Sequence, residues 1–254
     1  NACETYLIEE YFFFKHLKFH KQKIAFHRAS MRAYADFLKS QDIAVNYVES
    51  IEKKSDIRVL LEEILASGIT QINFYDPVDS WLLKRMNSFS ERIQLNMLET
   101  PYFINTNEDL STFFRADKKS FFQTTFYKQQ RVKHHVLMEK DGSPIGGKWT
   151  YDVDNRKKYP KGQQPPEIQF PKSSPYWEEA VQYVETHFHD YPGALEIKRI
   201  YPITFEETNE WLANFLKERF EEFGIYEDAI VKEEVFLNHS LLSPLMNAGL
   251  ISPR

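Results

Sequence analysis

One basic and aromatic stretch of the sequence has the residue types best suited to binding a ligand. From position 146 to 161 it reads GGKWTYDVDNRKKYPK, and the cations Arg156, Lys157 and Lys158 follow Trp149 closely in the chain. Cations fix phosphates and flat rings stack on bases, so this combination suits a contact with DNA.

The same stretch also fits a plain connector. Asp152 and Asp154 can pair with the neighbouring cations, and Trp149 can be buried as an anchor. The adjacent Gly146 and Gly147 predict a tight backbone turn beside that ring, because glycine adopts positive φ without a steric penalty. Residue types alone leave both interpretations open.

The end of the sequence, HSLLSPLMNAGLISPR, gathers hydroxyl groups around two leucines. Ser240 and Ser243 precede Pro244, which predicts the start of a helix where hydroxyls and backbone N–H groups come together. Such a helix start can bind phosphate, and an ordinary capped helix fits the same residues. Both interpretations stay open at this point.

Other candidates for chemistry are weaker. His16 and His20 stand four residues apart, as two metal ligands on a helix would, but the lysines around them would repel a cation, so we expect no metal site. A single cysteine, Cys3, excludes an internal disulfide and indicates a reducing compartment such as the cytoplasm. The sequence contains neither a glycine-rich phosphate loop nor a G-x-S-x-G motif.

The first half of the sequence alternates between short apolar runs and amphipathic segments. The expected strands are Thr5–Ile8, 43–48, 69–75 and 95–103, and the expected helices between them are 20–40, 55–68 and one that Asp79 or Ser80 caps. This pattern predicts an α/β fold, a Rossmann-like parallel sheet of the doubly wound kind with flanking helices. Ligands of such sheets bind at the carboxyl ends of the strands.

The second half predicts helices and a long connection. Helices are expected over 109–114, 121–138, 175–188 and 205–223, the last ending at Gly224, and five prolines fall between 140 and 174. We therefore expect an α/β antenna domain at 1–139, an interdomain loop at 140–174 and the start of a helical domain at 175–254. A net charge of −5 does not indicate a broad positively charged face for nucleic acid. The sequence has no apolar run of about 20 residues, so we expect a soluble protein with no membrane partner.

Four separated segments resemble the deoxyribodipyrimidine photolyase-related proteins. This family is the bacterial, iron–sulfur branch of the photolyase and cryptochrome superfamily, and it includes (6-4) photolyases. The segments are FHKQKIAFHRASMRAYADFL, KKSFFQTTFYKQQR, IGGKWTYDVDNRKK, and FGIYEDAI followed by NHSLLSPLMNAGLISPR.

The resemblance implies cofactors and roles for particular residues. It places FAD in the helical domain, with Ser240, Leu241, Leu242 and Ser243 along its phosphates and ribityl chain. It also implies a ribityl-lumazine antenna in the α/β domain, which Glu9 at the end of the first strand would contact.

The resemblance further implies light-driven repair of pyrimidine photoproducts, of the (6-4) type, by a monomer that binds damaged DNA through Arg156, Lys157 and Lys158. The family's first strand, its iron–sulfur cluster and most of its FAD contacts fall outside this sequence, so we expect no repair by this part alone. A cryptochrome-like photoreceptor without repair and a stand-alone α/β binding module remain as alternatives.

Overall fold

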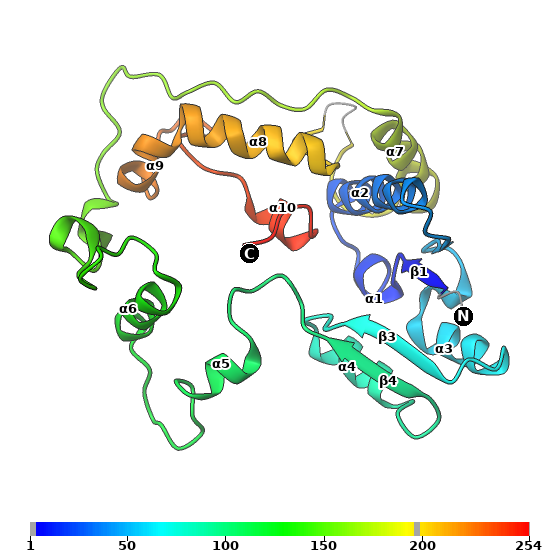
Figure 1. The fold of residues 1–254 in the computed structure, drawn as a ribbon. Coiled ribbons are helices and arrows are strands. Elements are labelled where there is room, and N and C mark those ends of the chain that lie inside the picture. The colour runs from blue at the N-terminus through cyan, green and yellow to red at the C-terminus, as the bar shows by residue number, and fades with distance from the viewer. Residues whose placement is uncertain (1–3, 196–198, 254) are drawn as a thin grey trace. The chain divides into compact units, whose positions relative to one another are not determined.

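The protein is mixed α/β and mostly helical, as the computed structural model in Figure 1 shows. The structure describes residues 4–195 and 199–253, so Cys3 lies outside the described residues. Contacts divide the chain into a first unit (1–103, 169–211 and 242–254) and a second unit (104–168 and 212–241). The domain bounds expected from the sequence stay a prediction.

The four expected strands form, but they pair in a different way. β1 (Thr5–Ile8) runs parallel to β2 (Val45–Val48), and β3 (Gln71–Tyr75) runs parallel to β4 (Gln94–Leu98). Within the described residues these are two separate two-stranded sheets where the sequence predicts one continuous sheet. Alternation of side chains identifies extended segments, whereas backbone hydrogen bonds between strands decide which of them pair.

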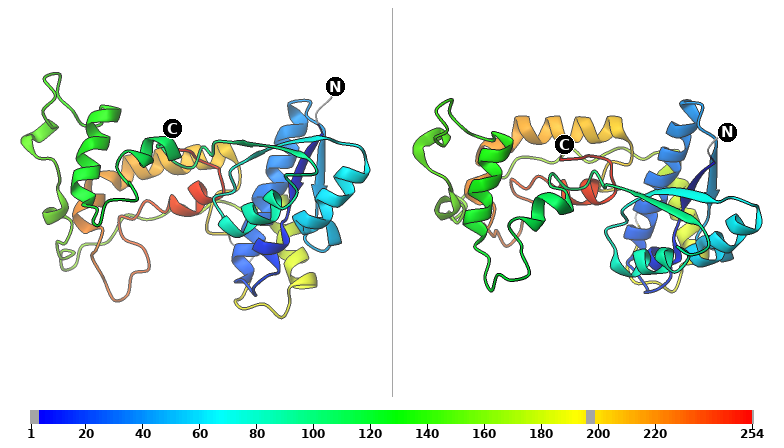
Figure 2. Two further views of the ribbon diagram at one scale, coloured as in Figure 1. Left: turned by 90° about the horizontal axis from the view of Figure 1, so that it is seen from below. Right: turned by 60° about the horizontal axis from the view of Figure 1, so that its bottom comes forward.

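Capping side chains fix where five helices of the first unit begin. These helices are α1 (Tyr11–Phe14), α2 (Lys21–Ser40), α3 (Ile57–Ala66), α4 (Ser80–Asn87) and α7 (Pro175–His187). Asp56 accepts a hydrogen bond from the backbone of α3, which begins at Ile57 and not at the expected residue 55. Asp79 caps α4 in the same way, as the sequence predicts. α2 packs along α7, and the two helices lie side by side in both views of Figure 2.

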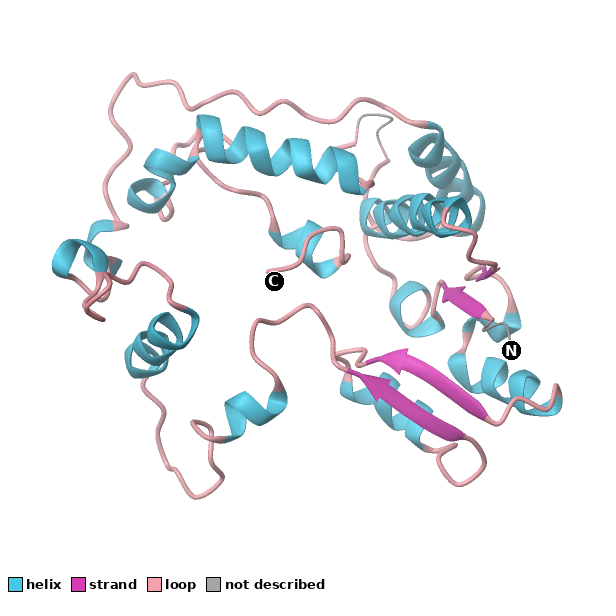
Figure 3. Cartoon of the chain, viewed as in Figure 1, coloured by secondary structure: helices cyan, strands magenta, loops and turns pink. Residues whose placement is uncertain are grey.

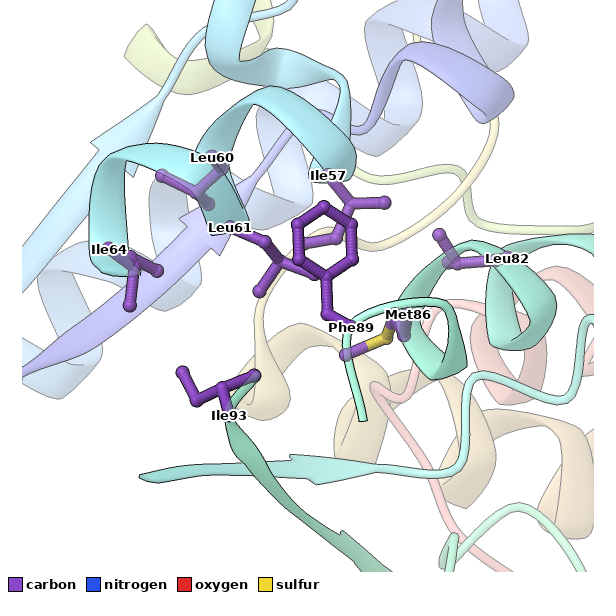
Figure 4. Packing of buried hydrophobic residues seen from close by; sticks show 8 residues of the cluster. All are labelled: Ile57, Leu60, Leu61, Ile64, Leu82, Met86, Phe89 and Ile93. Atoms are coloured by element: carbon purple, nitrogen blue, oxygen red, sulfur yellow. The ribbon is translucent and has the colours of Figure 1, made fainter. Parts of the chain in front are cut away.

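One apolar cluster underlies both strand pairs (Figure 4). Leu60, Leu61 and Ile64 project from one side of α3 towards Met86 of α4 and Phe89. The partly buried side chains that pack against this cluster come from β1 (Tyr6 and Ile8), β3 (Ile72 and Phe74) and β4 (Leu95), among others. The two small sheets therefore share one core.

The second unit has short helices joined by long loops. It contains α5 (Asn107–Ser111), α6 (Gln123–His134), α9 (Phe220–Tyr226) and two 3-10 turns, Ile145–Gly147 and Asp152–Asp154. α8 (Phe205–Glu218) runs from the first unit into the second, and α10 (Ser243–Asn247) belongs to the first. Figure 3 shows the stretch from 155 to 174 as loop.

Three details differ from the sequence expectations. The helix expected over 205–223 is divided at Arg219, and Gly224 lies inside α9, so it is not the stop that the sequence predicts. The fourth strand ends at Leu98. His16 follows α1 whereas His20 is the N-cap of α2, so the two imidazoles do not share one helix. No helix within residues 4–195 and 199–253 is long and apolar enough to cross a membrane.

Candidate functional site

A buried ion pair holds the end of β1. Glu9 follows the strand and is fully buried, and its carboxylate accepts hydrogen bonds from Arg28 Nη1 (2.8 Å), Tyr47 Oη (2.7 Å) and the Ser50 backbone N–H (2.8 Å). Arg28 Nη2 also donates to Glu179 on α7 at 2.6 Å. The pair thus ties β1, β2, α2 and α7 together.

The environment of this ion pair raises the pKa values of Arg28 and Tyr47. Burial by itself would lower the pKa of Arg28, but the hydrogen bond to Glu179 and the charge of Glu9 raise that pKa above its ordinary value. Burial, then the charge of Glu9, raises the pKa of Tyr47, which therefore stays a neutral donor. Three protein donors already occupy the Glu9 carboxylate, and its contact with an antenna stays a prediction.

A cavity of about 760 Å³ opens beside the carboxyl ends of β3 and β4 in the first unit. Tyr75 ends β3, Tyr102 follows β4, and Tyr34 and Phe37 face the cavity from α2. The rings in its wall are those of Phe13, Tyr34, Phe37, Tyr75, Tyr102, Tyr176 and Phe205. We call it the ring cavity; Glu9 does not line it.

Contacts among the rings shape this cavity. Tyr34 stacks on Phe37 at 6.1 Å between centroids, and Phe205 meets Phe37 edge-on at 5.1 Å. Tyr176 Oη donates to Asp36 at 3.0 Å, and burial raises the pKa of Tyr102. Flat walls with a few hydroxyls suit a conjugated ligand, and the ends of parallel strands are where such ligands bind.

The basic stretch of the second unit borders a groove of about 660 Å³, which we call the basic groove. Its walls are residues 156–163 and 228–232, which carry five cations, Arg156, Lys157, Lys158, Lys161 and Lys232, against a single carboxylate, Asp228. The structure therefore brings the three predicted DNA contacts together in one positively charged groove.

Neighbouring contacts hold the basic groove in place. Arg156 Nε lies 3.5 Å from Asp228, and both side chains are exposed, so this ion pair is weak. The Lys157 N–H donates to the Ile225 carbonyl at 3.2 Å, and Tyr159 Oη lies 3.2 Å from Asn238 Oδ1. Asp228 thus pairs with Arg156, for which the connector interpretation names Asp152 or Asp154 as partner, and the side chain of Asp154 lies outside the described residues.

Arg131 organises the loop that precedes the basic groove. Its guanidinium is buried and donates to the carbonyls of Val136, Leu137, Lys148 and Trp149. It also lies 5.5 Å from the centroid of the Trp149 ring, which is partly buried. Nothing in the sequence sets Arg131 apart from the other cations of α6, so sequence reasoning missed it.

The paired glycines adopt the turn that the sequence predicts. Gly146 and Gly147 have φ of 74° and 70°, a region that residues with a Cβ rarely occupy. A Cβ on Gly146 would also collide with the Tyr151 hydroxyl, which donates to the Ile145 carbonyl. Glycine is needed here because of both the backbone conformation and the close approach of the ring.

The predicted FAD segment begins α10, which has five residues. Pro244 lies in its first turn as predicted, the N-cap is Leu242, and no side chain caps this helix, which does not fit the interpretation as an ordinary capped helix. Ser243 is exposed, and Leu241 has a positive φ of 57°. Ser240 and Leu241 belong to the second unit, whereas Leu242 and Ser243 belong to the first.

Comparisons with known proteins connect these features to a family. Residues 1–199 match the family described as deoxyribodipyrimidine photo-lyase-related protein. A protein of Agrobacterium fabrum named (6-4) photolyase is 27% identical over 247 residues, which cover 91% of this chain and 46% of that protein. Uncharacterized protein R852 of Acanthamoeba polyphaga mimivirus is 32% identical over 171 residues, or 63% of this chain and 85% of that protein.

Proposed function

Because the chain belongs to the deoxyribodipyrimidine photo-lyase-related family, we propose that it is part of a flavoprotein that repairs pyrimidine photoproducts in DNA with light. Its similarity to a (6-4) photolyase supports the (6-4) photoproduct as the lesion. The chain spans 46% of that relative, so the proposed reaction is that of a longer protein.

The basic groove carries the proposal of DNA binding. Five cations against one carboxylate give it a local positive charge that the overall charge of −5 conceals. Such a groove attracts the phosphate backbone and positions it without reading the sequence. Arg156, Lys157 and Lys158 would hold phosphates while the damaged nucleotide is turned out of the duplex into a separate pocket.

The donor groups of the α10 segment fit part of FAD. The hydroxyls of Ser240 and Ser243 can donate to phosphate or ribityl oxygens, and Ser243 is exposed at a helix start that no side chain caps. Leu241 and Leu242 would line the ribityl chain beside them. When bound, FAD supplies the electron that starts the repair.

The ring cavity fits an antenna of the ribityl-lumazine kind. Its volume of about 760 Å³ accommodates a fused bicyclic ring with a short polyol, and its tyrosines offer both stacking faces and hydroxyl groups. Glu9 would act on this site by fixing α2 through Arg28. The shared core of the two strand pairs supports a Rossmann-like arrangement around the cavity.

The repair assay uses the full-length protein, loaded with FAD and illuminated with blue light under reducing conditions. We expect light-dependent loss of (6-4) lesions from damaged DNA. Lesions that persist while the flavin is photoreduced would contradict repair and favour a photoreceptor without repair activity.

A second experiment isolates the basic groove. Replacing Arg156, Lys157 and Lys158 with Ala removes up to three phosphate contacts, so the slope of log K against log salt should become less steep by up to about 2.7 for duplex DNA. The matched control replaces three exposed lysines outside the groove, Lys53, Lys84 and Lys119. Equal slopes for the two triple variants would contradict DNA binding at this groove.

A further inference from the structure

A cavity in the second unit adjoins the basic groove, and we call it the α6–α9 cavity. Its volume is about 730 Å³, and its walls come from the first residues of α6, the loop at 150–157, and α9 with its C-cap Glu227. Lys157 lines both this cavity and the basic groove, so the two open beside each other within one unit of the chain. The volume lies within the range of pockets that hold small organic ligands, which suits a group the size of a nucleoside.

Two exposed tyrosine rings line the α6–α9 cavity. Tyr127 on α6 is 43% exposed, and Tyr151 in the loop is 46% exposed. An accessible ring face is a platform on which a nucleobase can stack, and such stacking is a main source of affinity for unpaired bases. The same walls carry the hydroxyl groups of Thr124 and Thr150 and the amide of Gln123, which can bond to the edge of a base. The cavity therefore has the residue types that an unpaired base requires.

The charge changes sign between the basic groove and the α6–α9 cavity. The described residues that line the cavity include three carboxylates, Asp152, Glu221 and Glu227, and one cation, Lys157. A phosphate is therefore attracted to the groove and repelled from the cavity, whereas an uncharged base is not repelled. A DNA strand whose phosphates lie in the groove can thus place a base in the cavity. Because ionised carboxylates accept hydrogen bonds and donate none, the base that fits best carries an amino group.

The proposed repair reaction leaves bases of this kind unpaired. When a pyrimidine photoproduct turns out of the duplex, the purines opposite it lose their partners. Adenine and guanine each carry an amino group, whereas thymine carries carbonyl oxygens and no amino group. The carboxylates of the α6–α9 cavity therefore favour a purine of the undamaged strand over a lesion made from thymines.

We propose that the α6–α9 cavity binds a purine base of the undamaged strand, left unpaired opposite the lesion. The base stacks on Tyr127 and its amino group donates to Glu221, while phosphates of the same strand lie in the basic groove. A purine held in this way would keep the duplex from closing while the lesion occupies its own pocket. The proposal rests on the repair function proposed above and adds to it a site for the undamaged strand.

The test measures how the full-length protein, loaded with FAD and kept in the dark, binds a duplex that carries a (6-4) photoproduct of two thymines. Three duplexes are compared, with adenosines, 2′-deoxynebularine or abasic sites opposite the lesion, where nebularine is a purine nucleoside without the amino group. Fluorescence anisotropy gives a Kd for each duplex. Because a missing base or amino group also weakens the duplex itself, the quantity tested is the change in a Kd ratio between the unaltered protein and a variant, which cancels that effect.

Two variants probe the two contacts. Tyr127→Leu removes the ring, so the preference for adenosine over the abasic site should fall about tenfold. Glu221→Ala removes the acceptor, so the preference for adenosine over deoxynebularine should fall about fivefold. Tyr151 is left unchanged, because its hydroxyl donates to the Ile145 carbonyl and its loss would disturb the loop. The matched control is Glu108→Ala, which should leave both ratios unchanged, since Glu108 is also exposed in the first turn of a short helix of the second unit.

Three results would count against the proposal, and they differ in what else they refute. If Tyr127→Leu and Glu221→Ala keep both ratios of the unaltered protein, the purine does not contact these residues and the repair proposal still stands. If either variant weakens the binding of all three duplexes equally, its residue acts on the fold or on the phosphates and not on the base. If the unaltered protein does not bind damaged DNA, both this proposal and the repair function are refuted.

Discussion

Replacing Arg28 with Met should destabilise the first unit far more than the loss of a surface ion pair would. Arg28 is 1% exposed and contacts three carboxylates, of which Glu9 is fully buried. Met matches much of the volume of Arg but leaves Glu9 without its cationic partner. Tyr47 and Ser50 still donate to that carboxylate, so the variant tests the charge of Arg28 more than the satisfaction of Glu9 by hydrogen bonds.

The magnitude follows from the geometry of the pair. With Arg28 Nη1 2.8 Å from Glu9 Oε1, Coulomb's law with an effective dielectric constant of 20 gives an attraction of about 6 kcal/mol. The desolvation of both ions offsets much of that attraction in the native protein. Removing one partner leaves the desolvation of the other uncompensated, and we expect the free energy of unfolding to fall by about 3 to 5 kcal/mol.

The assay is urea denaturation at pH 7, followed by circular dichroism, with a double-mutant cycle. Glu9→Gln removes the buried charge, so the double variant Glu9→Gln with Arg28→Met should be more stable than the sum of the single effects predicts, by at least about 2 kcal/mol. Arg58→Met is the matched control, because Arg58 pairs with Asp56 at 2.5 Å while half exposed. This control should cost less than about 1 kcal/mol.

Two outcomes would refute this reasoning. If Arg28→Met costs no more than Arg58→Met, the buried pair contributes nothing beyond a surface pair. If the effects of Glu9→Gln and Arg28→Met add, the two groups are not coupled across 2.8 Å, and the arrangement at the end of β1 has another cause.

Two further predictions concern single residues. Burial lowers the pKa of His27 to about 4, below the ordinary 6.5. As the pH falls from 7 to 5, the His27 imidazole therefore takes up a proton in the unfolded chain but stays neutral in the folded one. The free energy of unfolding should fall by about 2 kcal/mol over this range. Urea denaturation at both pH values should show a fall smaller by that amount in His27→Gln, and an equal fall would contradict the burial of a neutral imidazole. Gly146→Ala should lower the stability more than Gly142→Ala does, by about 1 kcal/mol or more, which is the usual cost of overpacking. Both glycines have a positive φ, so the backbone strain of an alanine is similar at the two positions. Only at Gly146 does the added Cβ also meet Tyr151. Equal midpoints in thermal denaturation would show that the Tyr151 ring moves aside freely.

Local signals in the sequence predicted the helices and strands well. Asp56 and Asp79 mark helix starts because a carboxylate that accepts from the first backbone N–H groups acts over two or three residues. The pairing of the strands was harder to predict, since β1 pairs with a strand some 40 residues later and the hydrogen bonds depend on the whole core. The stop expected at Gly224 failed because a glycine inside a helix costs only about 1 kcal/mol, which other contacts offset.

The candidate sites could be predicted only where their residues lie close together in the sequence. The basic groove draws most of its cations from one stretch of the chain, so sequence could find Arg156, Lys157 and Lys158 together. The network of Arg28 could not be found in this way, because Glu9, Glu49 and Glu179 lie 19, 21 and 151 positions away. The ring cavity likewise collects its rings from several elements, each of which looks like ordinary core in the sequence.

The position of Arg28 on α2 connects these observations. Lys23 lines a cavity of about 330 Å³ near the start of α2, and Tyr34 lines the ring cavity. The two residues are eleven positions apart, about three helical turns, and therefore share one face of α2. Arg28 is five residues after Lys23 and points about 140° away, so the buried ion pairs grip the side of α2 opposite the two cavities. A helix held on one side by charged groups and lined on the other by two cavities cannot rotate without breaking the pair with Glu9. Arg28→Met should therefore speed amide hydrogen exchange along α2, whereas Arg58→Met should not.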